Sequence, residues 1–184
     1  MKKLLILALS LALCVGFAAC GAKDDAKTND VTPDVDASSV GGQHWAKFVS
    51  EVEANPEATV EEIANALISL EINQFMGMAM PMEAGAEYFP GFDNYVPTGY
   101  TTAANFMPMI GSIAYVGYVF ELPEDADVAA FVQSLTDNCN PRWNICVMAD
   151  QTVAGSKGNK VFFLMCPATY EMPDAEADMG GMAL

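Results

Sequence analysis

A nearly continuous run of apolar and aromatic residues from Ile113 to Leu122 (IAYVGYVFEL) limits the possible folds of this chain more than any other segment. Such a run is typical of a central strand that is buried on both faces of its sheet. Hydrophobic residues make up 52% of the sequence, which excludes an intrinsically disordered chain and provides enough material for a real core. The length of 184 residues fits one domain.

Three segments carry apolar residues at helical spacing. Pro56 ends the first helix, and Thr59 with Glu62 forms a capping box at the start of the second. The third helix is expected to open at residues 123–125, where acidic residues lie near the positive end of the helix dipole. The apolar stripes are Trp45, Phe48, Val49 and Val52; Val60, Ile63, Leu67 and Leu70; and Val128, Phe131, Val132 and Leu135.

Three further strands are expected, at Gln74–Met82, Ile145–Ala149 and Lys160–Met165. A turn cluster at Ala154–Asn159 joins the last two strands as a hairpin. The order of these elements predicts an α+β domain with an antiparallel sheet of about four strands and two to three helices packed on one face.

The first twenty residues form a pattern of their own. Met1-Lys2-Lys3 is a short basic region, and the apolar stretch Leu4–Phe17 is too short to span a membrane but fits a secretory signal. Phe17-Ala18-Ala19-Cys20 resembles the lipobox of bacterial lipoproteins, with Phe17 where leucine is usual. The resemblance implies cleavage before Cys20 and attachment of lipid to its sulfur and its new amine. The alternatives are an uncleaved anchor and a signal cut near Ala19 that leaves Cys20 free.

The resemblance also implies an organisation for the whole chain. Residues 1–19 would be the signal peptide, residues 20–41 the lipidated Cys20 and a disordered tether, and residues 42–170 the α+β domain. Residues 171–184 are acidic and rich in glycine and methionine, and are expected to form a flexible tail. Stable anchoring takes two acyl chains or two signals, so a multiply acylated Cys20 would hold the domain on the extracytoplasmic face of a cell membrane.

The charge balance limits the partners. With 24 acidic and 8 basic side chains the formal net charge is −16, which argues against nucleic acid and disfavours contact with anionic headgroups. The membrane partner is therefore expected to be bound through the lipid on Cys20 and not through the protein surface.

Methionines at alternate positions make up the most unusual motif. Met76, Met78, Met80 and Met82 would share one face of a strand, and Met107 and Met109 repeat the spacing once. Thioethers favour Cu(I) among biological metals, and the segment looks like the Met-x-Met clusters of exported copper-handling proteins. The commoner interpretation is that these methionines fill an irregular core, and an apolar groove for a peptide or lipid is a third. Apart from copper, no cofactor is expected.

Residues 83–112 form a long segment without a clear element, which is uncommon in a compact domain unless it is functional. Its aromatic residues are expected either to pack down onto the domain, which is the commoner outcome, or to form a partner surface. These residues are Tyr88, Phe89, Phe92, Tyr95 and Tyr100.

Cys139, Cys146 and Cys166 remain in the exported domain, where at most one disulfide leaves one thiol over. Cys139 and Cys146 flank a turn and could form a bridge that closes a small loop. Cys146 and Cys166 could instead be neighbours across the hairpin, and three reduced buried thiols are a further alternative. No catalytic motif is present, and the single histidine, His44, is expected at the rim of the domain.

Residues from about 113 to 167 make the chain similar to small bacterial lipoproteins with an uncharacterised exported α+β domain. We therefore expect a non-catalytic, membrane-tethered extracytoplasmic protein of the cell envelope that binds a small ligand or a partner protein through the 83–112 segment. A Cu(I) or Ag(I) binder that uses the alternate methionines is the alternative. A hydrolase with two of the many carboxylates is a third hypothesis.

Overall fold

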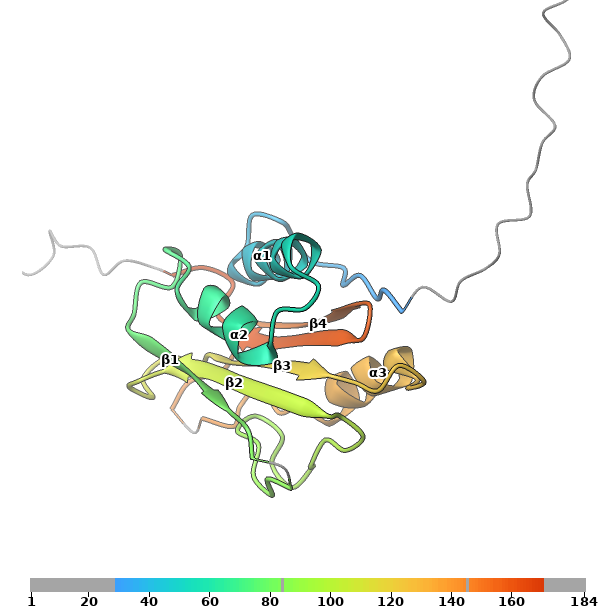
Figure 1. Ribbon diagram of the computed structural model, residues 1–184. Helices are drawn as coiled ribbons and strands as arrows, with labels where there is room; N and C mark the ends of the chain where they lie inside the picture. The colour runs from blue at the N-terminus through green and yellow to red at the C-terminus, as the bar shows by residue number, and fades with distance from the viewer. Residues whose placement is uncertain (1–28, 84, 145, 171–184) are drawn as a thin grey trace, which may run out of the picture.

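A computed structural model describes residues 29–83, 85–144 and 146–170 of the chain (Figure 1). These residues form one five-stranded antiparallel sheet with the strand order β1-β2-β3-β5-β4. The strands are β1 (Gly77–Pro81), β2 (Thr102–Pro108), β3 (Val116–Glu121), β4 (Gln151–Lys157) and β5 (Lys160–Cys166), and the helices are α1 (Val40–Ala54), α2 (Val60–Ile68) and α3 (Val128–Asn138).

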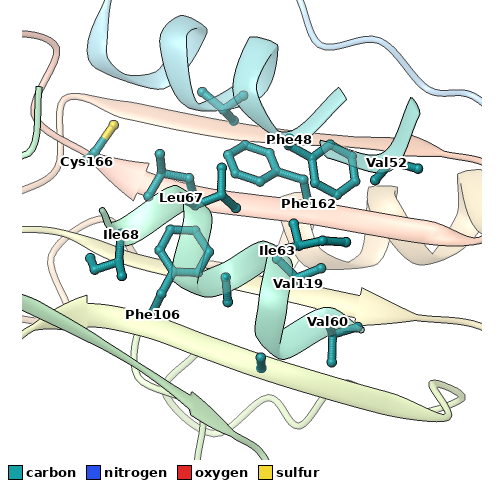
Figure 2. Close-up of a cluster of buried hydrophobic side chains, with 14 of the residues drawn as sticks. Phe48, Val52, Val60, Ile63, Leu67, Ile68, Phe106, Val119, Phe162 and Cys166 are labelled. Carbon is teal, nitrogen blue, oxygen red and sulfur yellow. The ribbon is translucent and has the colours of Figure 1, made fainter. Parts of the chain in front are cut away.

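Helices α1 and α2 cover one face of the sheet and form the first core with it (Figures 1 and 2). Phe48 of α1 packs against Phe162 of β5, with the two rings tilted and their centroids 5.4 Å apart. Leu67 of α2 is fully buried in the same cluster, together with Phe106 of β2. The helix stripes predicted from the sequence therefore face this sheet.

The opposite face carries a second core, which is covered by α3 and by residues 86–100. Figure 1 shows α3 behind the sheet, on the side away from α1 and α2. Buried aromatic residues dominate this core, among them Tyr118 and Phe120 of β3 and Phe163 of β5. Both cores lie between residues 29 and 170, so this part of the chain holds a complete sheet with a layer on each face.

The predicted α+β class is confirmed, with five strands instead of about four. Two helices pack on one face as expected, whereas α3 packs on the other. The prediction that the central apolar run is buried on both faces is also confirmed, since Val119 belongs to the first core and Tyr118 to the second.

Two strands were not predicted at their true positions. Strand β2 lies within the segment 83–112. It was not predicted because Ala103, Ala104 and Asn105 in its middle have little strand preference. Strand β4 begins at Gln151, not at Ile145, and only Gly158 and Asn159 form the turn to β5. A glycine, Gly155, occupies the middle of β4. A Cβ at this position would come within 3 Å of Trp45 and of the backbone of Val31, so a larger side chain would not fit.

Residues 29–41 are not a disordered tether, which corrects that part of the prediction. Val31 forms a bridge with Ser156 of β4, and the Asp30 carboxylate accepts hydrogen bonds from the Gly158 amide at 2.8 Å and the Lys157 amine at 3.0 Å. Ser39 caps α1 by accepting a hydrogen bond from the Gly42 amide at 3.1 Å. The domain therefore begins before residue 42.

The other helix ends follow their local sequence. The predicted capping box at Thr59 and Glu62 is present at the start of α2. The third helix starts later than expected, because Asp127 and not the segment 123–125 provides its cap, through a 3.1 Å bond from the Ala130 amide. Among residues 29–170, leaving aside residues 84 and 145, no helix is long and apolar enough to cross a membrane.

Candidate functional site

The alternate methionines of β1 lie on the face of the sheet opposite α1 and α2. Ala79 packs against the first core, and a Cβ at Gly77 would overlap Ile68 of α2, so these two residues face the helices. Successive residues of a strand point to opposite faces, which places Met78 and Met80 on the other side. The prediction that alternate thioethers share one face is thus confirmed for the strand itself.

Strand β2 adds further methionines to the same face. The antiparallel register places Met78 directly opposite Met107, and the Met109 amide donates to the Met76 carbonyl oxygen at 3.0 Å. Opposite residues of an antiparallel pair lie on the same face with Cβ atoms about 5 Å apart. We call the resulting group the methionine surface; it consists of Met76, Met78, Met80, Met107 and Met109.

Most of the methionine surface is accessible to water. The exposed fractions are 79% for Met76, 39% for Met78 and 40% for Met80, and Met109 on β2's side is 58% exposed. The commoner interpretation from sequence, that these methionines fill the core, is therefore wrong for these residues. The strand lies at the edge of the sheet, beyond the area that α3 and residues 86–100 cover.

Met82 differs from the other methionines of its segment. It points to the same face, but its side chain is half-buried and packs against the second core. The core interpretation holds for this residue. Of the set Met76, Met78, Met80 and Met82, the structure thus keeps the first three together on an open surface.

The aromatic residues of the 83–112 segment pack down onto the sheet. Phe89 and Phe92 are fully buried, and Tyr95 donates a 2.9 Å hydrogen bond to Ser134 of α3. Tyr100 is half-buried beside Phe120, with ring centroids 5.4 Å apart. Only Tyr88, which is 68% exposed, remains available from the proposed partner surface. The expectation that these aromatic residues form the contact surface is corrected accordingly, because four of the five rings belong to the second core or pack against it.

Cys139, Cys146 and Cys166 form no disulfide in the structure. The Cys139 thiol, at the end of α3, donates to the Thr136 carbonyl oxygen at 3.2 Å, whereas Cys146 is exposed to solvent. The predicted Cys139–Cys146 bridge is therefore absent, and the alternative of three reduced thiols describes the structure. Burial raises the pKa of the Cys166 thiol to about 12, which leaves it protonated and a poor nucleophile at neutral pH.

His44 lies inside the first layer and not at the rim, which corrects the sequence prediction. Its Nδ1 donates to the Val40 carbonyl oxygen at 2.7 Å, and its Nε2 accepts a hydrogen bond from the Tyr115 hydroxyl at 2.8 Å. Desolvation by burial lowers the pKa of the imidazole, so His44 is neutral at pH 7. Both ring nitrogens are used in structural hydrogen bonds, so the ring is not available to activate a nucleophile.

A polar groove of about 900 Å³ lies at the end of the sheet where α2 begins, and no motif of the sequence predicts it. Glutamates from different elements line it, among them Glu57, Glu61, Glu121 and Glu124. Lys160 lies beside them with a buried side chain; its amine donates to the Pro56 carbonyl oxygen at 3.0 Å and contacts the Glu121 carboxylate at 3.3 Å.

The groove brings several carboxylates together, as the hydrolase hypothesis requires. Glu121 is already held at both carboxylate oxygens, by Lys160 and by a 3.2 Å hydrogen bond from Thr102. This pairing gives Glu121 a structural role as the counterion of a buried amine. Hydrolysis would have to use the exposed glutamates of the rim.

The buried histidine makes the stability of the domain depend on pH. Because the pKa of His44 is lowered by folding, the folded state binds fewer protons than the unfolded state as pH falls through the ordinary value of 6.5. We expect the free energy of unfolding to fall between pH 7 and pH 5.5, and the imidazole to titrate with a midpoint below 6.5 by NMR.

His44 is the only histidine of the chain, so its signals are unambiguous. In the variant His44→Gln the free energy of unfolding should no longer depend on pH between pH 7 and pH 6. Most carboxylates titrate below this range and do not contribute to it. A midpoint at or above 6.5 would contradict the buried, doubly hydrogen-bonded placement.

Within the described residues, no three side chains among histidine, cysteine, aspartate and glutamate lie together in a way that could hold a metal ion. The methionine surface is thus the group with the most distinctive chemistry, and the polar groove is the second candidate. Comparison of the chain with known protein families, with curated proteins and with solved structures finds no match.

Proposed function

We propose that this chain is a non-catalytic, membrane-tethered extracytoplasmic binding protein, anchored through lipid on Cys20 and using the methionine surface as its binding site. The anchor is supported by residues 1–20, in which a basic start and an apolar run precede Ala18-Ala19-Cys20. These residues lie outside those that the structure describes. Residues 21–28 would then connect the lipid to the domain, to which Asp30 and Val31 already belong.

The observation that carries the proposed binding role is the exposure of the methionine surface. Soluble domains rarely leave neighbouring large apolar side chains open to water unless they bind something. Here the exposed Met76, Met78, Met80 and Met109 are followed directly by Ile110, which is 75% exposed. Methionine side chains are flexible and polarizable, which suits them to adaptable apolar contacts. The surface is uncharged in a protein with a net charge of −16.

Two features support a non-catalytic role. His44 is neutral and hydrogen-bonded at both ring nitrogens, and Cys166 carries a thiol with a pKa of about 12. Neither group provides the activated nucleophile or the accessible base that hydrolytic catalysis requires.

A second candidate function is the binding of Cu(I) or Ag(I), which the shared face of the alternate sulfurs favours. Thioethers are soft, uncharged ligands, and soft monovalent metals prefer them to oxygen donors. The same surface would serve either function, since an apolar ligand and a soft ion both contact the exposed sulfurs.

The anchor is tested by metabolic labelling of the full-length chain in a bacterial host with an alkyne analogue of palmitate. We expect label in the natural chain and none in Cys20→Ala, because only the thiol of Cys20 is placed for acylation after the signal. Cys139→Ala and Cys146→Ala are the matched controls and should keep the label. Label that persists in Cys20→Ala would contradict the anchor.

The binding surface is tested with the chain from residue 21 onward, which contains the whole described domain, and with the uncharged apolar dye Nile red. The triple variant Met76→Gln, Met78→Gln, Met109→Gln should reduce the dye fluorescence by about half or more, because it removes apolar area from the surface.

Met148→Gln is the control, since Met148 is 52% exposed but lies outside the methionine surface, between α3 and β4. It should leave the dye fluorescence nearly unchanged. If the triple variant and Met148→Gln have equal effects, or if the natural chain binds no dye, the proposal that the methionine surface is a binding site is contradicted.

A further inference from the structure

The register of β1 and β2 arranges four methionines as two pairs across the strands. Met78 is opposite Met107, and Met76 is opposite Met109, as the 3.0 Å hydrogen bond between their backbones requires. The two pairs are separated by two residues along each strand, a distance of about 7 Å. Within each pair the Cβ atoms are about 5 Å apart, so the four side chains form a compact block on one face and their flexible ends can reach one another.

Met80 and Met82 have no sulfur opposite them. Met80 pairs with Asn105, whose amide nitrogen is committed to a 3.0 Å hydrogen bond with the Gly117 carbonyl oxygen. The Met82 amide donates a hydrogen bond to the Ala103 carbonyl oxygen, and the Met82 side chain packs against the second core. The strand pairing therefore brings together Met76, Met78, Met107 and Met109. This set differs from the run of alternate methionines along β1.

The block suits one class of ligand. Its donors are neutral thioethers on side chains with three rotatable bonds, which lets the sulfurs adjust to an ion between them. Such donors select soft monovalent ions over Ca²⁺ or Mg²⁺, which need oxygen ligands. The strongly negative net charge of the chain favours the approach of a cation.

We propose that one Cu(I) or Ag(I) ion binds between β1 and β2, with Met78 and Met107 as its central ligands and Met76 and Met109 as the flanking ones. This proposal rests on the second candidate function and adds the ligand set to it. The ion binds in the oxidation state in which it arrives, so no electron transfer is involved. Because the ligands come from two strands, the ion also ties the edge strand β1 to β2.

The test uses the chain from residue 21 onward, with accessible thiols first blocked by N-ethylmaleimide because Cys146 is exposed and would compete for a soft ion. Cu(I) is titrated without oxygen against a chromogenic chelator. The variants Met78→Leu and Met107→Leu are each expected to weaken binding by roughly tenfold or more, since each removes a coordinating sulfur.

Met82→Leu and Met148→Leu are the matched controls and should change the affinity by less than about twofold, because leucine replaces methionine with little change in volume. A second measurement follows the methionine methyl signals by NMR while Ag(I) is added. We expect the signals of Met76, Met78, Met107 and Met109 to shift and those of Met82 and Met165 to stay in place.

The outcomes separate the ligand set from the function. If Met107→Leu has no effect while Met80→Leu and Met82→Leu weaken binding, metal binding stands and the cross-strand set is overturned. If the natural chain does not compete for Cu(I) at micromolar concentration and no methyl signal shifts with Ag(I), both the ligand set and the second candidate function are overturned. The Nile red measurement tests the proposed apolar binding surface separately, because it does not depend on metal binding.

Discussion

The pairing register between β1 and β2 is the constraint on which the candidate site depends. A strand alternates its side chains between two faces, so a shift of one residue would turn every methionine of β1 toward α2. The close approach of Gly77 to Ile68 and the packing of Ala79 against the first core hold the register, since larger side chains at these positions would not fit under α2. The small residues of β1 thus determine where its large residues go.

The sheet is enclosed unequally, which explains why the methionines of β1 are exposed on its second face. On the second face, α3 and the aromatic segment reach across β5, β3 and part of β2, and Tyr118 anchors this segment through a 2.8 Å hydrogen bond to the Pro90 carbonyl oxygen. The side chains that cover the second face reach Met82 but not the other methionines of β1. The edge strand β1 is therefore covered on its first face and open on its second. Methionine gives such an edge an apolar but flexible surface, without the β-branched residues that favour aggregation between sheet edges.

Much of this architecture could be predicted from the sequence, and the failures have physical causes. Helical periodicity located α1 and α2, apolar runs located β3 and β5, and the Thr59 capping box located the start of α2. Strand β2 was missed because Ala103, Ala104 and Asn105 have no strand preference of their own and depend on both neighbouring strands. The alternate methionines were found from spacing alone, but their exposure, and the contribution of Met107 and Met109, depend on register and on which segments cover the sheet.

The methionine surface depends on one pairing, in which Met78 and Met107 lie opposite each other on the open face of the sheet. A NOESY experiment on the domain with labelled methionine methyl groups measures this directly. We expect cross-peaks between the methyl groups of Met78 and Met107, and none between Met78 and the ring of Phe106, which lies in the first core. Cross-peaks from Met78 to Phe106 or to Ile68 would show that β1 is turned over, and would contradict the methionine surface and everything inferred from it.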